Sequence, residues 1–188
     1  MPDNFRSSVI RLAHANPELR PHLLPLLVEK TAAVDFNIHG KNILDNATVK
    51  GNNAYVQGKA TVGGNAVVSG KAKVKGTAKV FGSAEVYENA EVSGDATVWG
   101  SAHVYGNAKV KGWGDVTDEA HVYGDATVFG GAEVGGNAHV YGKAKVSGKA
   151  YLKDDANISG TAEILGGRWD GSEGPITSGK WMSPGVPA

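Results

Sequence analysis

The chain of 188 residues contains no cysteine and no proline between residues 26 and 174. Without thiols it is indifferent to redox potential, so its composition fits a reducing compartment and an extracellular particle equally well. Lysine plus arginine (19) equals aspartate plus glutamate (19), so the formal net charge is zero. This balance removes the basic surface expected of a nucleic-acid binder or a polybasic membrane binder, and we expect neither partner.

Long apolar segments are also missing. The longest strongly apolar run, residues 23–28, is interrupted by Pro25 and is far shorter than the roughly 20 residues that cross a bilayer. We therefore expect no transmembrane helix. The N-terminus has Asp3 before Arg6 and no small-residue cleavage pattern behind an apolar core, so we expect no secretory signal peptide.

Glycine is abundant, with 27 residues, yet there is no G-X-Y period, which excludes collagen. The glycines instead follow a period of six. From Ala54 onward the chain reads A-x-V-x-G-x, and an aliphatic residue recurs at every sixth position from Val56 to Ile164, giving 19 anchors without an insertion. Upstream, Val49 and Val56 are seven apart, which indicates one extra residue near residues 52 and 53.

Positions around each anchor are nearly invariant. Alanine stands two residues before it in 18 of 19 hexads, with Gly114 as the exception. Glycine stands two residues after it in 16 hexads, and the replacements are Glu88, Asp118 and Asp154. Because side chains alternate along a strand, alanine and the anchor share one side, and the glycine and its follower form a turn. A six-residue unit cannot bury its own valine, so the units must stack.

A second period of 18 indicates three hexads in each coil. Residues that lie one above another should resemble each other, and two columns do, Tyr87, Tyr105, Tyr123 and Tyr141 after the anchor and His103, His121 and His139 before it. The sequence therefore predicts an all-β solenoid, a single-stranded three-sided parallel β-helix with 19 faces. At about 4.8 Å per coil, its length is roughly 30 Å.

Three segments follow from this pattern. Residues 36–167 form the β-helix, residues 1–35 a short N-terminal helical segment, and residues 168–188 an irregular C-terminal cap or tail. Both ends of a β-helix expose unpaired backbone groups, so both need covers or partners.

The repeat resembles the hexapeptide-repeat family, whose members form left-handed β-helices and commonly trimerise. The A-x-V-x-G pattern looks most like repeat proteins encoded in phage, prophage and bacterial genomes. Many enzymes of the family carry glycine directly after the anchor, whereas here glycine follows two places later. Left-handedness is the favoured expectation, and right-handed bactofilin-like polymers are a structural alternative.

The N-terminal segment has two interpretations. Phe5, Val9 and Leu12 form one helical stripe, and a second, proline-divided helix carries an apolar group made of Leu23, Leu24 and Leu27. These side chains either cap the first coil or dock into a larger protein assembly. The resemblance favours a virion, or otherwise the cytoplasm, as the location.

The histidine and tyrosine columns are the candidate functional residues. They flank the same anchors on one outward face, and stacked rings with polar tips are typical interface material. The leading interpretation is the contact of a homotrimer, and a carbohydrate-binding platform is the second. Histidines one coil apart do not converge on one ion, and only a column that faces a three-fold axis could place three copies of one histidine around a metal. We expect no metal and no cofactor.

Enzymatic alternatives come from the resemblance. Many members are acyltransferases, which usually place a catalytic histidine on or near an extruded loop, but the 19 hexads run without one. The γ-class carbonic anhydrases use inter-subunit histidines together with a second histidine five residues after a ligand, and this chain has none. We therefore expect a non-enzymatic structural or attachment component, plausible in a phage virion, with enzyme and bactofilin-like polymer as alternatives.

Overall fold

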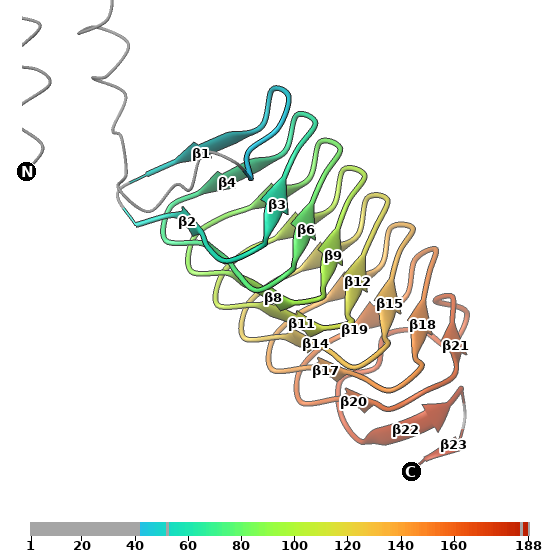
Figure 1. Ribbon diagram of the computed structural model, residues 1–188. Helices are drawn as coiled ribbons and strands as arrows, with labels where there is room; N and C mark the ends of the chain where they lie inside the picture. Colours follow the sequence, from blue (N-terminus) through green and yellow to red (C-terminus); the bar gives the residue numbers. More distant parts are fainter. Residues whose placement is uncertain (1–41, 52, 185, 188) are drawn as a thin grey trace, which may run out of the picture. The chain divides into compact units, whose positions relative to one another are not determined.

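The computed structural model describes residues 42–51, 53–184 and 186–187, and these form a parallel β-solenoid with three sheets (Figure 1). The predicted N-terminal segment, with Phe5, Val9, Leu12, Leu23, Leu24 and Leu27, lies outside the described residues. Within them, no helix is long and apolar enough to cross a membrane.

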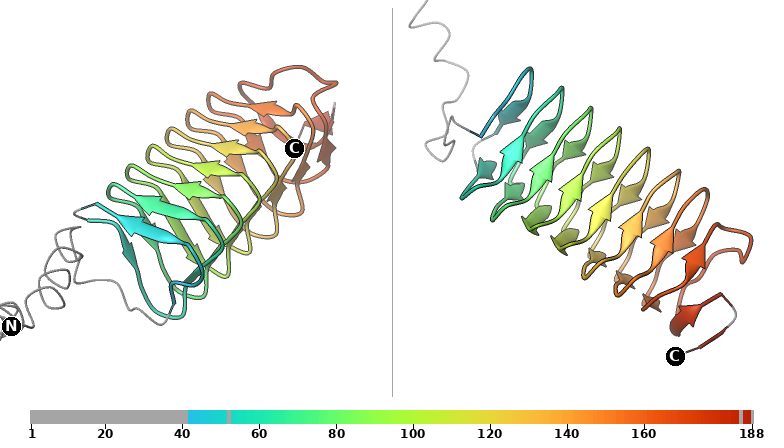
Figure 2. Two further views of the ribbon diagram at one scale, coloured as in Figure 1. Left: turned by 90° about the horizontal axis from the view of Figure 1, so that it is seen from above. Right: turned by 45° about the vertical axis from the view of Figure 1, so that its right-hand side comes forward.

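Successive strands pass from sheet to sheet, so every third strand belongs to the same sheet (Figure 2). The first sheet contains β1 (Thr48–Lys50), β4 (Val67–Ser69), β7 (Glu85–Val86), β10 (His103–Val104), β13 (His121–Val122), β16 (His139–Val140) and β19 (Asn157–Ile158).

The second sheet contains β2 (Tyr55–Val56), β5 (Lys73–Val74), β8 (Glu91–Gly94), β11 (Lys109–Gly112), β14 (Thr127–Val128), β17 (Lys145–Val146), β20 (Glu163–Ile164), β22 (Lys180–Ser183) and β23 (Val186–Pro187). The third sheet contains β3 (Thr61–Val62), β6 (Lys79–Val80), β9 (Thr97–Val98), β12 (Asp115–Val116), β15 (Glu133–Val134), β18 (Tyr151–Leu152) and β21 (Arg168–Trp169).

The register confirms the period of 18. In the first sheet Val104 pairs with Val122, and Val122 with Val140. At the start of the coil, Val49 pairs with Val68, 19 residues away, which confirms the extra residue inferred from the spacing of Val49 and Val56. The three-sided parallel β-helix predicted from the hexads is therefore the observed fold.

The core consists of the alanine and anchor columns. Every anchor from Val56 to Ile164 is at most 1% exposed, as is each alanine two residues before it. Burying a valine side chain stabilises by roughly 1.5–3 kcal/mol. Because each hexad contributes only one such side chain and one methyl group, each coil depends on its neighbours to exclude water.

The turn after each anchor needs a left-handed backbone. Between residues 58 and 160, every residue two places after an anchor has positive φ, and the three predicted exceptions to glycine adopt it too: Glu88 (φ 60°), Asp118 (φ 57°) and Asp154 (φ 52°). Glycine populates this region without steric cost, whereas other residues pay for it.

Acidic side chains compensate at three of the non-glycine turns. Each carboxylate accepts a hydrogen bond from the backbone amide of the turn glycine one coil later: Glu88 Oε2 from Gly106 (2.8 Å), Asp118 Oδ2 from Gly136 (3.0 Å) and Asp45 Oδ2 from Gly64 (3.1 Å). Asp154 differs, because its carboxylate pairs with Lys153 Nζ. The acidic residues thus add a hydrogen bond to the next coil, which glycine, although it adopts positive φ without strain, cannot form.

Residues 168–183 add a further coil with irregular spacing. Trp169 pairs with Leu152, Ile176 bridges to Ile158, and Trp181 pairs with Ile164. Trp169 is 1% exposed, and its ring meets that of Trp181 edge-on at 6.4 Å.

Both indole N–H groups of this coil donate to nearby carbonyl oxygens, at Gly166 (2.8 Å) and Ser178 (2.9 Å). Beyond them, β23 pairs with β22 in the antiparallel sense. Large aromatic rings with satisfied polar groups therefore fill the last coil in place of valine.

We predict that Gly82→Ala destabilises the solenoid. Its φ is +72°, and a Cβ there would lie 2.7 Å from the backbone oxygen of Gly100. The left-handed cost and the overlap together should lower the free energy of unfolding by about 2–4 kcal/mol, measured by denaturant titration.

Gly131→Ala is the matched control, because its φ is not positive and the nearest atom to a Cβ is 3.4 Å away. It should stay within about 0.5 kcal/mol of wild type. Equal stability of the two variants would contradict the role assigned to the turn glycines.

Candidate interaction face

The tyrosine column forms a continuous ladder on the first sheet. Tyr87, Tyr105, Tyr123 and Tyr141 follow the anchors of four successive strands. Neighbouring ring centroids are 4.9 Å apart, and the ring planes differ by only 2–3°. The parallel register creates this stack, because it places the same hexad position of each coil directly over that of the next.

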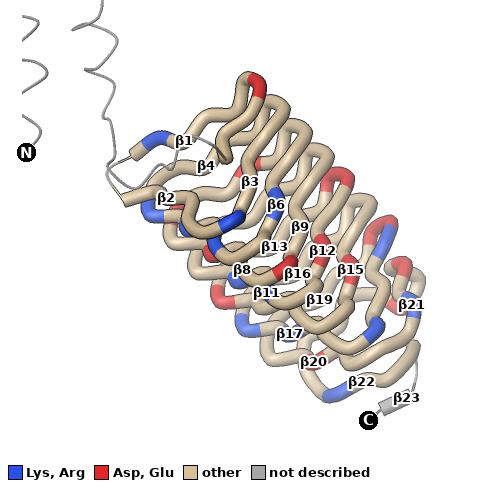
Figure 3. Tube along the Cα trace, viewed as in Figure 1, with Lys and Arg blue, Asp and Glu red and all other residues tan. Residues whose placement is uncertain are grey.

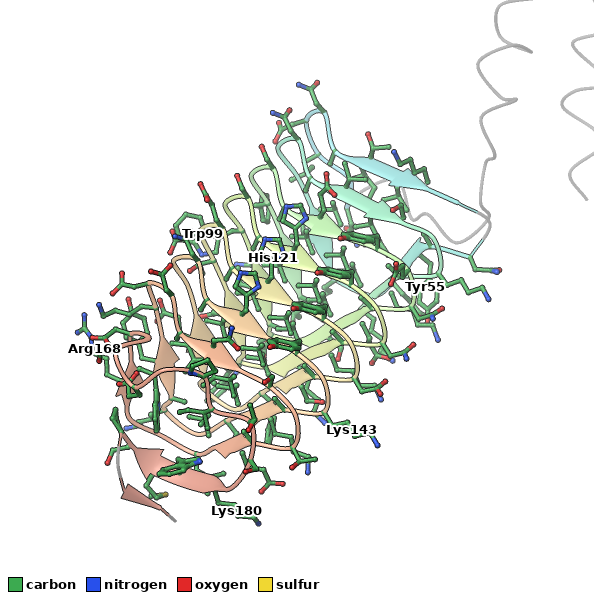
Figure 4. All side chains as sticks on the ribbon, turned by 180° about the vertical axis from the view of Figure 1, so that it is seen from behind. Tyr55, Trp99, His121, Lys143, Arg168 and Lys180 are labelled. Carbon is green, nitrogen blue, oxygen red and sulfur yellow. The ribbon has the colours of Figure 1, made fainter. Side chains whose placement is uncertain are left out.

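A second ladder runs beside the first. His103, His121 and His139 stand before the same anchors, with ring centroids 4.8–4.9 Å apart and planes within 7°. Each ring also meets a tyrosine of the preceding coil nearly at right angles, at 6.3–6.4 Å. Figure 4 shows His121 within this column of rings. We call the seven residues the Tyr/His face.

All seven side chains are half-buried, although they point away from the core. Burial raises the pKa of Tyr87, Tyr105 and Tyr123 above the usual value of 10.0, so these phenols remain neutral hydrogen-bonding groups. The sequence-predicted interface residues are thus brought together into one ordered aromatic surface.

Polar residues border the Tyr/His face at both ends. In the histidine column, Glu85 precedes His103 and Asn157 follows His139. One edge is lined by a side-chain amide ladder, in which Asn89 donates to Asn107 (3.1 Å) and Asn107 to Asp125 (3.0 Å). An aromatic centre with a polar rim is the usual anatomy of a protein interface.

The histidines do not have equivalent surroundings. His103 Nδ1 lies 3.6 Å from Glu85 Oε2, whereas His121 lies between two other imidazoles. Burial lowers the pKa of His121 below 6.5, and the neighbouring His103 and His139 lower it further, while Glu119 acts in the opposite direction. Its burial therefore disfavours the charged form of the middle imidazole.

Stacked parallel rings do not converge on a point, which is what ligands of one metal ion must do. Among the described residues, no group of three or more His, Cys, Asp or Glu side chains is placed to hold a metal ion.

The second sheet carries lysine and glutamate side chains (Figure 3), and in its register Thr127 separates Lys109 from Lys145. Register places Glu91 between Lys73 and Lys109, and ion pairs join Lys145 and Lys180 to Glu163 at 2.9 and 3.0 Å. Hydrogen bonds from both lysines lower the pKa of Glu163. The lysines and glutamates of this sheet therefore compensate one another's charge.

The third sheet has a different surface. Strands β12 and β15 present Asp115 and Glu133 outward, and burial together with Asp115 and Asp118 raises the pKa of Glu133. Trp99 follows the anchor of β9 and is 49% exposed. Sequence reasoning did not single out Trp99, although no other hexad has tryptophan directly after its anchor.

Trp113 occupies a corner between the second and third sheets. Its side chain is 68% exposed, and Nε1 donates to Asp95 Oδ2 at 2.9 Å. The coil opens slightly here, because a Cβ at Gly112 would lie 3.6 Å from Gly130 N, against 2.9 Å for Gly94 over Gly112. Trp113 is therefore a turn residue at a corner where the coil is widened.

Register, turns and core together define the chain as a hexapeptide-repeat-like β-solenoid. A family model described as the YdcK β-solenoid repeat matches residues 90–106. This segment contains β8, β9 and β10, one strand from each sheet, and so corresponds to about one coil. Comparison with curated proteins and with solved structures gave no significant match.

We predict that His121 titrates below 6.5 and that the double substitution His103→Asn with His139→Asn raises its pKa toward that value. The substitutions expose the ring and remove two like charges. NMR titration of the imidazole Cε1–H signal measures the change. Thr127→Asn, a neutral change at the same hexad position of the second sheet, should leave the His121 pKa unaltered.

The lowered pKa of His121 makes the free energy of unfolding depend on pH. Because the pKa of His121 is lowered by folding, the unfolded chain binds more protons just below pH 6.5. Above pH 6.5 the ring is neutral in both states and stability is unaffected by its titration. As pH falls from 6.5 toward the lowered pKa, proton binding favours the unfolded chain and the protein loses stability. A His121 pKa at or above 6.5 in the folded protein would contradict the assigned environment.

Proposed function

We propose that this protein is a non-enzymatic homotrimer whose β-solenoid serves as a structural or attachment component of a larger assembly, such as a phage virion. The observation that carries the proposal is the Tyr/His face. Seven rings are held in two continuous ladders on one flat side of a rigid coil.

The chemistry of this face suits contact between identical copies. Tyrosine and histidine rings are already immobilised by stacking, so association costs little additional side-chain entropy. They offer apolar area with polar tips, the composition that is enriched at interface centres. Since the chain has no net charge, identical copies meet without overall repulsion.

Attachment to a larger assembly is assigned to the N-terminal segment. Its apolar side chains, Phe5, Val9, Leu12, Leu23, Leu24 and Leu27, are spaced for amphipathic helices that fit a groove in another protein. This part of the proposal rests on the sequence pattern and on the resemblance to repeat proteins of phage and bacterial genomes.

The alternatives have less support. Acyltransferases of this fold usually carry a catalytic histidine on or near an extruded loop, whereas strands β2 to β20 follow one another at hexad spacing. A bactofilin-like polymer needs coil ends that stack, but β23 lies antiparallel on β22 in the last coil. A saccharide could stack on the same aromatic face, and the experiment below separates that role from trimer contact.

We predict that Tyr123→Glu converts the trimer into monomers. Glutamate removes one ring from the ladder centre and introduces a charge that contact would desolvate. Light scattering coupled to size exclusion should give three times the 19.4 kDa chain mass for wild type and one chain mass for the variant.

Phe129→Glu is the matched control. Phe129 also follows its anchor directly and is also half-buried, but it belongs to the next hexad, on the second sheet. This variant should remain trimeric, and circular dichroism should show both variants folded. An unchanged trimer in Tyr123→Glu would overturn trimer contact and favour the saccharide platform.

A further inference from the structure

Imidazoles stacked face to face form an arrangement that depends on charge. At centroid distances of 4.8–4.9 Å, neutral rings of His103, His121 and His139 pack as ordinary aromatics. When protonated, the same rings become a row of like charges at the same distance. Of all side chains, histidine is the one whose ordinary pKa places this change between pH 5 and 8.

We propose that the Tyr/His face is a pH-dependent interface, which holds copies of the chain together near neutral pH and releases them on acidification by protonation of its histidine ladder. The proposal rests on the trimer contact proposed above and adds the way in which that contact is regulated.

The groups around the ladder provide too little negative charge to neutralise three imidazolium ions. Glu85, on β7, lies 3.6 Å from His103 Nδ1 and can compensate that ring. Glu119, at the turn before β13, favours the charged form of His121 only as the weakest of the influences on it.

The remaining neighbours of the ladder are neutral near pH 7. Tyr87, Tyr105 and Tyr123 present ring edges to the three histidines, and Asn157 of β19 is the register partner of His139. Among the described residues, His121 and His139 therefore have no ion pair with a carboxylate like that of His103 with Glu85.

Contact between copies would strengthen this effect. The pKa of His121 is already lowered by burial in the single chain, and a second copy over the face would remove more water from the ring. The assembled form then binds fewer protons than the separated chains, so acid shifts the equilibrium toward separation. If each chain takes up one proton on release, the trimer association constant falls about 10³-fold per pH unit within the titration range.

The test measures assembly of the full-length chain by sedimentation equilibrium between pH 8 and pH 5. We expect trimers at pH 8, monomers at pH 5, and an unchanged far-ultraviolet circular dichroism spectrum that shows the solenoid intact. The triple variant His103→Gln, His121→Gln, His139→Gln, which cannot acquire these charges, should remain trimeric at pH 5.

A measurement on wild type alone provides a second criterion. Dilution calorimetry in buffers of different ionisation enthalpy should show at least one proton taken up per chain on dissociation at pH 6. Trimers that persist unchanged to pH 5, or dissociation without proton uptake, would overturn the switch and leave the trimer contact standing. Monomers at every pH would overturn the trimer contact and the switch with it.

Discussion

Parallel hydrogen bonding between successive coils is the constraint on which the rest of the structure depends. It places each residue over the residue 18 positions later along most of the chain, as in the pairing of His103 with His121 and of His121 with His139. The equivalent position of the next coil thus carries the same side chain or a complementary one, and register determines which side chains are nearest neighbours. Interior, corners and faces are all columns of this one lattice.

The same constraint makes the columns differ in the residue types that they can contain. Between Val56 and Ile164 the interior columns contain alanine or a compact aliphatic residue, with Gly114 as the exception, because the side chains there are fully enclosed. A corner column needs positive φ and leaves little room for a Cβ, because the corner of the next coil lies directly against it. The outward columns are free of both demands. They carry lysine and glutamate side chains on one sheet, an aromatic double ladder on another, and exposed Trp99 with acidic residues on the third.

This division explains what the sequence could predict. Interior and corner columns are nearly invariant, so the hexad and the turns at Glu88 and Asp118 could be predicted from spacing, and the outward tyrosine and histidine columns indicated the coil of 18 residues. The carboxylate bonds from these turns to the next coil were not, because they depend on side-chain direction rather than on period. The last coil could not be predicted from the period either. Its anchors Trp169 and Trp181 keep the register of Leu152 and Ile164 with 17 residues per coil instead of 18.

Between Val56 and Ile164 the hexads continue without an extruded loop. The faces therefore differ in the side chains that are repeated along their outward columns. Repetition extends the properties of one side chain over a continuous surface. One histidine beside one tyrosine is a common surface pair, whereas three beside four form a stack whose charge and packing change together with pH. The proposed trimer contact fits this geometry, because an identical face on another copy of the chain has the same repeat along its length.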